Sequence, residues 1–349
     1  MAIKQWDPED LPKRPGLYIN FTEAAEAQVL GGARGIVAIP LKAYGSKASE
    51  GEFYTVTNEA DAEAQFGKTN IQSIRFALAG GAKEVLVYAM PATPDADAYN
   101  AMREEFEARP FNVFVFDGEI DATEQAATLA WLAQNRTEKK HFMFVAGGSA
   151  DDDKVPATGD ARSATLKDEY IANLINGVVI GSTEYSSGAY APYIAGLIAG
   201  TPINKSITYA QVAVDDVTKR MRNAEIVASL TAGSLVLVHD GDKVKVEQGI
   251  ATSGDKIRKM RARQAIATDL EKLARDNYIG KVDNNPAGQA ALVSAFKLYL
   301  ETLENENVLV GPDVQISETA PSVGDQVYVD IAYTEMDSME RIFVTINAE

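Results

Sequence analysis

The sequence predicts an α/β domain followed by an α+β domain, and three observations support this fold class. Short apolar runs alternate with helical segments between residues 35 and 200, which is typical of a sheet covered by helices on both faces. Two long helical stretches begin at residue 255, and a strand with alternating polar and apolar residues follows them at 326–333. A length of 349 residues agrees with roughly two domains.

The composition excludes several classes of function. The chain has 33 basic and 50 acidic residues, so its net charge of −17 argues against nucleic acid and anionic membranes as partners. It contains no cysteine and two histidines, which excludes disulfides, iron–sulfur clusters, cysteine nucleophiles and a three-histidine metal site. We find no run of 18 apolar residues and no N-terminal leader, so we expect a cytoplasmic product with no membrane insertion.

The N-terminal residues 1–21 are predicted to form an arm. Pro8, Pro12 and Pro15 are too closely spaced for a helix. The β-prone run at 17–21 is isolated from other strand signals, and a lone strand is unstable. It must therefore join a sheet in its own subunit or in another one.

The α/β region begins with a regular alternation of elements. Gly80 and Gly81 stop one helix, Pro94 and Asp95 open the next, and Asp121 is an expected N-cap. We expect strands at 35–41, 85–88, 112–116 and 142–145, with helices at 58–66, 71–80, 94–108 and 121–135.

The second half of this region is less regular. Residues 149–165 are polar and are predicted to form an exposed loop. The small, apolar residues 188–200 predict a closely packed helix, and Asp240-Gly241 predicts a hairpin turn. The other expected elements are helices at 166–175 and 222–231 and strands at 178–180, 234–238 and 243–246.

The C-terminal region is predicted to contain two helices, 255–277 and 286–305, and then three strands, 314–316, 326–333 and 341–346. Its charge is uneven, because residues 301–349 carry eleven acids against Arg341 alone, a net −10. Five basic residues lie within eight positions: Lys256, Arg258, Lys259, Arg261 and Arg263. This basic run is either a solvated face beside the core residues Ile257, Met260 and Ile266, or a docking surface for an acidic partner, other copies included.

Sequence patterns for catalysis are weak. Ser149 and His239-Asp240 contain the residue types of a catalytic triad, but no G-x-S-x-G pattern occurs. No P-loop pattern occurs, and the glycines at 31–35 precede a strand instead of a helix. The run 151–153 lacks the spaced ligands of a calcium loop. An α/β hydrolase or a nucleotide-binding enzyme remains the alternative, and we expect no cofactor and no metal.

Several segments together resemble the contractile tail sheath proteins of myophage tails, prophage-like particles and R-type bacteriocins. These segments are 14–21 (RPGLYINF), 32–41 (GARGIVAIPL), 199–206 (AGTPINKS), 223–226 (NAEI), 232–237 (AGSLVL), 266–269 (IATD) and 277–282 (NYIGKV). Their order and spacing carry the resemblance from about residue 14 to the C-terminus.

The resemblance implies a structural protein and not an enzyme. It implies four parts: an N-terminal arm (1–21), an outer α/β sheath domain (22–250), an inner domain that packs on the tube (251–333) and a C-terminal arm (334–349). In this family both arms donate a strand to a sheet in a neighbouring subunit. The implied strand-exchange residues are Leu17, Tyr18, Ile19, Asn20 and Phe21 in the N-arm and Ile342, Phe343, Val344, Thr345 and Ile346 in the C-arm. We place the receiving sheet at Val327, Tyr328, Val329 and Ile331, and tube or subunit docking at Lys256, Arg258, Lys259, Arg261 and Arg263.

The partners implied by the resemblance are other copies of the chain in stacked hexameric rings, a tail tube protein, and baseplate and tail terminator proteins. The subunit would assemble in the bacterial cytoplasm into a virion tail or a bacteriocin-like particle. A tail tube protein is a further alternative, but a tube subunit is dominated by one β-barrel, which the predicted helices contradict.

Overall fold

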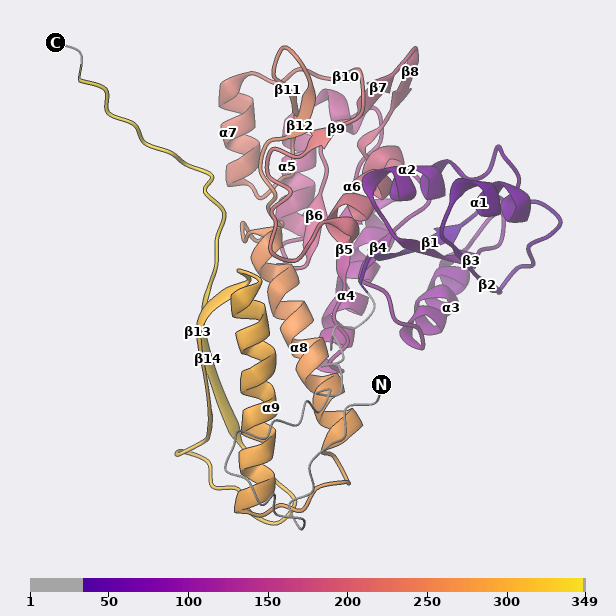
Figure 1. The fold of residues 1–349 in the computed structure, drawn as a ribbon. Helices are drawn as coiled ribbons and strands as arrows, with labels where there is room; N and C mark the ends of the chain where they lie inside the picture. The colour runs from indigo at the N-terminus through magenta and orange to yellow at the C-terminus, as the bar shows by residue number, and fades with distance from the viewer. Residues whose placement is uncertain (1–33, 348–349) are drawn as a thin grey trace, which may run out of the picture.

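A computed structural model describes residues 34–347, so the predicted N-arm and its strand at 17–21 lie outside the described residues. The described chain has two parts (Figure 1): an α/β body, and a long helical hairpin flanked by a two-stranded sheet. The predicted order, α/β first and α+β second, is confirmed.

A six-stranded sheet forms the centre of the body, in the order β2-β3-β1-β4-β5-β6. Every neighbouring pair is parallel except β2, which pairs with β3 in antiparallel fashion at the edge. The strands are β1 (Ile36–Leu41), β2 (Phe53–Val56), β3 (Glu84–Ala89), β4 (Val113–Val115), β5 (Met143–Ala146) and β6 (Ile171–Asn173). Neither β2 nor β6 was predicted as a strand.

Helices cover both faces of this sheet, as the continuous apolar runs predict. Strand β1 divides its side chains between two hydrophobic clusters. Val37 and Ile39 pack in one cluster with Ile74 and Ile194, while Ala38 packs in the other with Trp131. The covering helices are α1 (Glu59–Phe66), α2 (Gln72–Gly80) and α6 (Ser187–Gly200) on one face, and α3 (Ala96–Glu107) and α4 (Ala122–Thr137) on the other.

The predicted helix ends are confirmed. The carboxylates of Asp95 and Asp121 accept hydrogen bonds from the backbone N–H groups of Ala98 and Glu124, which makes each aspartate an N-cap. Helix α2 ends at Gly81, whose φ of 114° is a left-handed conformation that favours glycine.

The predicted loop at 149–165 is wrong. This segment forms a short 3-10 helix, η1 (Asp152–Lys154), and helix α5 (Pro156–Thr165). Its polar residues look solvent-exposed in the sequence, but several of them form buried hydrogen bonds. Asp153 is 2% exposed, and its carboxylate accepts from the N–H and Oγ of Ser187 at 2.6 and 2.5 Å. Burial raises the pKa of Asp153 to about 6, although the bonds from Ser187 oppose this shift.

The predicted helix at 166–175 is also wrong, because residues 171–173 form strand β6 against β5. Asn173 is fully buried, accepts from Nε of Arg162 at 2.7 Å and donates to Oγ of Ser163 at 2.7 Å. A buried polar network of this kind leaves no periodic apolar pattern in the sequence.

The predicted hairpin is confirmed, with Gly241 at a φ of 104° in its turn. Two small antiparallel sheets and one further helix complete the body. These are β7 (Val178–Ile180) with β8 (Thr183–Tyr185) and β10 (Asp216–Val217); β12 (Val244–Val246) with β11 (Leu237–His239) and β9 (Gln211–Val212); and α7 (Asn223–Thr231).

The predicted close packing of residues 188–200 is confirmed in the contact of α6 with α2. A Cβ atom built on Gly196 would lie 2.0 Å from the carbonyl oxygen of Ala77, and one on Gly200 would lie 2.0 Å from that of Gly81. The two backbones approach so closely that only glycine fits at these positions.

Substituting Gly196→Val should therefore lower the free energy of unfolding by about 3 kcal/mol or more, the upper range for overpacking a core. Urea unfolding followed by circular dichroism measures this loss. Ala101→Val on the exposed face of α3 is the matched control, and it should cost only about 0.5 kcal/mol of helix propensity. Equal losses in the two variants would contradict a tight contact at Gly196.

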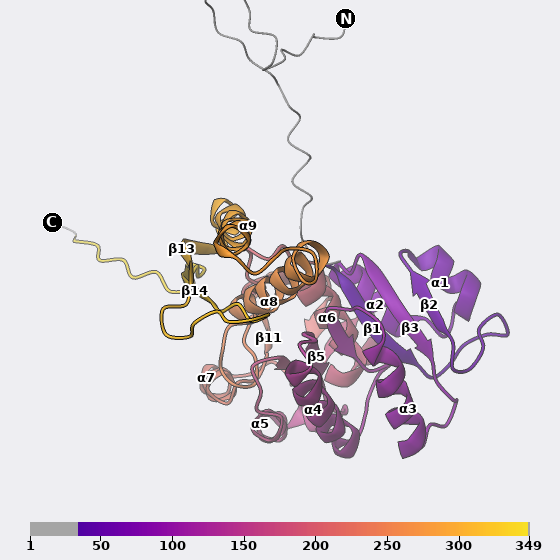
Figure 2. The same cartoon turned by 90° about the horizontal axis from the view of Figure 1, so that it is seen from below.

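The C-terminal part consists of helix α8 (Ile257–Asn277), helix α9 (Pro286–Asn305), strand β13 (Leu309–Ile316) and strand β14 (Val329–Glu335). Leu300, Leu303 and Leu309 belong to a separate hydrophobic cluster that holds the hairpin and the two strands together. The predicted strand at 341–346 is not formed within the chain, where this segment extends away from the body (Figures 1 and 2). None of the helices between residues 34 and 347 has the length and apolar character of a membrane span.

Candidate functional site: the C-terminal sheet and its extended segment

Strands β13 and β14 form an antiparallel sheet of two strands beside α9 (Figure 1). The side chains of Val329, Ile331 and Tyr333 are half-buried against the C-terminal cluster, while Asp330 and Ala332 are exposed. The predicted alternation of a half-buried strand is confirmed, although the strand begins two residues after Val327.

One edge of β14 is open. The N–H of Ser317 donates to the carbonyl of Tyr328, and the N–H of Met336 donates to the carbonyl of Val308. The backbone N–H and C=O groups of an antiparallel strand point alternately to its two sides. In β14 these groups point toward β13 at the even-numbered residues. The N–H and C=O groups of Ile331 therefore face the other side, where no strand among residues 34–347 pairs with β14.

An apolar segment follows β14 at residues 342–346. The side chains of Ile342, Phe343, Val344 and Ile346 are 75, 91, 74 and 83% exposed. Four neighbouring apolar side chains exposed to this extent are typical of an interaction surface. The chain thus carries an open sheet edge and an extended apolar segment within the same region.

The stem that joins β14 to this segment is held by the basic run on α8. Lys256 Nζ lies 2.9 Å from a carboxylate oxygen of Asp337 and 3.0 Å from one of Glu340. Lys259 Nζ lies 3.6 Å from Asp337, and Arg263 Nε donates to Glu335 at 2.5 Å. Burial alone lowers the pKa of Lys256, but these carboxylates outweigh it and the pKa rises.

Glu340 is the last anchored residue of the stem, and its side chain is 7% exposed. Besides Lys256, its carboxylate accepts from Thr208 Oγ1 at 2.9 Å and from Gln248 Nε2 at 3.2 Å. These contacts tie the stem to both parts of the described chain. Glu335, Asp337 and Glu340 were not predicted individually as partners of the basic run, although the opposite charges of 256–263 and 301–349 indicate such a pairing.

The basic run is not a uniformly solvated face. Ile257, Met260 and Ile266 are core residues, as expected, but Arg258 is 7% exposed as well. Its guanidinium donates to Ser338 Oγ at 2.9 Å and to the carbonyl of Asn307 at 3.1 Å. Tube or subunit docking by the five basic residues stays a prediction, and their charge is largely engaged within the chain.

The residues considered for catalysis do not meet through hydrogen bonds in the described part of the chain. Ser149 pairs with Asp152, whereas His239 Nδ1 accepts from the N–H of Gly241 in the hairpin turn. Asp151 pairs with Lys154. Within residues 34–347 no group of three acidic or histidine side chains is placed to hold a metal ion.

The described site is an open sheet edge beside an exposed apolar segment, and it contains no catalytic or metal-binding group among the residues considered. The family model described as the phage tail sheath protein central domain matches residues 92–252, and that of the phage tail sheath C-terminal domain matches residues 252–349. The chain belongs to the phage tail sheath family. It is a structural sheath subunit and not an enzyme, so the hydrolase, nucleotide-binding and tail tube alternatives are set aside.

Individual relatives agree with this assignment. The chain is 24% identical to the tail sheath protein of Clostridium phage phiCD119 over 309 residues, which cover 84% of this chain and 81% of that protein. Its fold is similar to the crystal structure of a sheath tail protein from Desulfitobacterium hafniense, with a TM-score of 0.76, 21% identity and coverage of 94% and 99% of the two chains. It is also similar to the anti-feeding prophage helical sheath in its contracted state, with a TM-score of 0.73, 16% identity and coverage of 97% and 100%.

Proposed function

We propose that this subunit polymerises around a tail tube as a helical sheath that contracts and drives the tube through a cell envelope. The observation that carries the proposal is the pairing, in one C-terminal region, of an open β14 edge with an exposed apolar segment at 342–346. In a lattice, the segment of one copy would add a strand to the sheet of the next. The fold similarity to the anti-feeding prophage sheath in its contracted state supports contraction.

The four parts predicted from the sequence fit this function. Residues 251–333 would lie inside against the tube, residues 22–250 would face outward, and arms 1–21 and 334–349 would join neighbouring copies. The receiving edge would be that of Val329 and Ile331, with Val327 and Tyr328 leading into it.

The proposed partners are further copies in stacked hexameric rings, a tail tube protein, and baseplate and terminator proteins. The fold is similar to a chain in the anti-feeding prophage baseplate structure, with a TM-score of 0.74. This similarity supports a contact between the sheath and a baseplate. The particle would be a phage tail or an R-type bacteriocin assembled in the bacterial cytoplasm.

Strand donation supplies enough free energy for the lattice. A donated strand of five residues forms about five backbone hydrogen bonds, each contributing ~0.5–1.5 kcal/mol net. Two arms per subunit then contribute several kcal/mol, and the bonds persist while the outer domains move.

We propose that the ion pairs of Lys256 and Lys259 set the position and direction in which the C-terminal segment leaves the subunit. Replacing both lysines with methionine should raise amide hydrogen exchange in residues 335–340 about tenfold, because several partly buried ion pairs sum to about 1–2 kcal/mol. Mass spectrometry of the exchanged peptides measures this change. Lys297→Met, on an exposed position of α9, is the control and should leave exchange unchanged. Unchanged exchange in the double variant would show that the ion pairs do not hold the stem.

Negative-stain electron microscopy of the purified subunit, alone and with its tube protein, tests the proposed function. We expect hollow tubules with six-fold end views, and a tube inside them when the tube protein is present. Uniform small particles under all conditions, including with baseplate present to nucleate growth, would overturn the proposal.

A further inference from the structure

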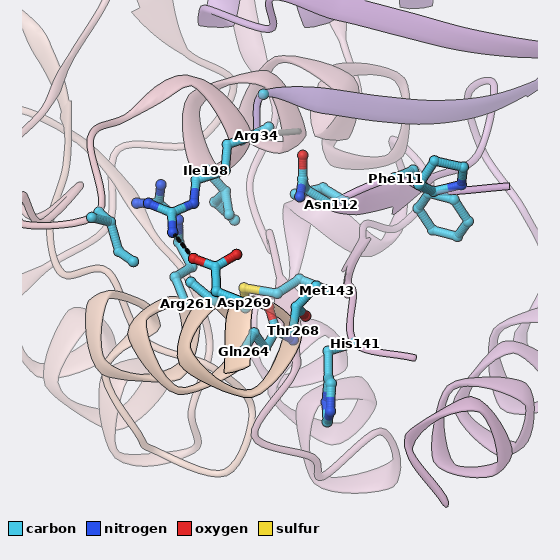
Figure 3. Close-up of a pocket in the computed structure, with 16 residues that line it drawn as sticks. Arg34, Phe111, Asn112, His141, Met143, Ile198, Arg261, Gln264, Thr268 and Asp269 are labelled. Atoms are coloured by element: carbon cyan, nitrogen blue, oxygen red, sulfur yellow. Dashed lines mark hydrogen bonds and ion pairs between the residues drawn. The ribbon is translucent and has the colours of Figure 1, made fainter. Parts of the chain in front are cut away.

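A small cavity of about 140 Å³ lies where the C-terminal part meets the body (Figure 3). Its walls come from the residues that precede β1, β4 and β5, from the end of α6 and from one side of α8. Its polar lining residues are Arg34, Asn112, His141, Arg261, Gln264, Thr268 and Asp269.

Two buried polar atoms of this lining have no hydrogen-bond partner within the described chain: Nη1 of Arg261 and Nδ1 of His141. The other terminal nitrogen of Arg261, Nη2, donates to the carbonyl of Thr201. Burial, and then the charge of Arg34, lower the pKa of Arg261 to about 10, so the guanidinium stays charged at neutral pH. Burying the Nη1 donor of a charged guanidinium without an acceptor costs free energy. Such an atom therefore indicates a site where an acceptor binds.

The acid in the cavity already has partners of its own. The carboxylate of Asp269 lies 2.6 Å from Arg34 Nη2 and accepts from the hydroxyl of Tyr299 at 2.7 Å. The described lining thus holds two guanidinium groups and one carboxylate, together with a histidine whose pKa burial and Arg136 lower. The site favours an additional anion.

We propose that this cavity binds a carboxylate, supplied by an acidic side chain of a neighbouring copy of this chain. A volume of about 140 Å³ admits the end of an aspartate or glutamate and little more. Every copy carries 50 acidic residues, so a cationic cavity on one copy meets an acidic surface on the next. Thr268 is exposed and Arg34 is half-buried, so the cavity lining reaches the surface of the described residues.

The position of the cavity gives the contact a consequence. Arg261 is on α8, whereas Asn112 precedes β4 of the body, and the amide oxygen of Asn112 accepts from Ile36 N at 2.9 Å. This bond leaves the amide nitrogen of Asn112 as a donor in the cavity lining. A bound carboxylate would therefore bridge the two parts of the subunit as well as two copies.

The test uses the full chain and rests on the proposed function, because its main measurement is assembly. Arg261→Met should leave the circular dichroism of the dispersed subunit unchanged, change its melting temperature only through the lost bond to Thr201, and lower the sedimenting fraction about tenfold or more, the effect of losing one charged hydrogen bond. Arg261→Lys should retain part of the assembly. Arg275→Met, on the exposed far end of α8, should assemble as the wild type does.

A second pair of variants keeps the proposal testable if Arg261→Met fails to fold. Thr268→Glu places a carboxylate of the same chain at the cavity and should block assembly, whereas the neutral Thr268→Gln should not. Wild-type assembly by both Arg261→Met and Thr268→Glu would overturn the inference and leave the proposed function intact. Failure of the wild type itself to assemble would instead count against the proposed function.

Sodium acetate separates the two sources of a carboxylate. If the neighbouring copy supplies it, acetate should raise the melting temperature of the dispersed subunit only slightly, even at high concentration, and should compete with wild-type assembly only weakly. If acetate raises the melting temperature of the wild type, but not of Arg261→Met, while assembly is unaffected by either variant, the ligand is a free small carboxylate and the proposed source is wrong.

Discussion

A chain that ends at Glu340 is expected to fold like the full-length subunit and to form no sheath. The removed segment contains the four exposed apolar side chains, which make little contact with their own subunit. Glu340 itself, with its contacts to Lys256 and Thr208, is retained. The loss of stability should be below about 0.5 kcal/mol, the range of surface changes away from structural features. The loss of assembly should be complete, because each donated strand forms about five hydrogen bonds.

Thermal melting of the shortened chain measures its stability, and negative-stain microscopy shows whether it assembles. A chain that ends at Asn347 is the matched control, because it keeps residues 342–346 and should assemble normally. Long tubules formed by the chain that ends at Glu340 would show that the C-terminal segment joins no neighbour. A large drop in melting temperature would show that the segment packs on its own subunit instead.

Much of the body could be predicted because its strands are continuous apolar runs. Residues 35–41 and 142–145 are buried on both faces of a parallel sheet, so nearly every position is apolar. Helix ends could be predicted where one side chain caps the helix, as Asp121 caps α4.

The errors at 149–175 share one physical cause. Asp153 and Asn173 are buried and Arg162 is partly buried, and hydrogen bonds and ion pairs with one another and with nearby residues satisfy their polar groups. A pattern of apolar residues contains no record of such pairing, so polarity suggested exposure. The short edge strand β2 was missed for a related reason, because only Val56 among its residues is fully buried.

The candidate site was predictable only in part. The alternation of β14 and the apolar residues 342–346 are local properties that the sequence displays. The ion pair between Lys256 and Asp337 joins residues 81 positions apart, and the cavity around Arg261 brings together residues between 34 and 269. Their existence depends on how the hairpin packs against the body, which no local pattern determines.

Substituting Ile331→Pro should abolish sheath formation while leaving the subunit folded. The N–H of residue 331 points away from β13, so proline removes a donor from the open edge and leaves the β13–β14 ladder intact. Ile331→Ala is the matched control, because it loses the same packing against the C-terminal cluster and keeps the N–H. Both variants should lose about 1–2 kcal/mol of stability, less than a fully buried isoleucine would, since Ile331 is half-buried.

Assembly should separate the two variants, with tubules from Ile331→Ala and dispersed subunits from Ile331→Pro. Ala332→Pro is the opposite control, because the N–H of residue 332 points toward β13. Removing this N–H should unfold the two-stranded sheet. Normal tubules from Ile331→Pro would mean that the incoming strand does not bind along β14, and the free edge of β13 would become the receiving edge. The direction of a single backbone N–H thus decides whether a proline at that position tests the open edge of β14 or breaks the β13–β14 ladder.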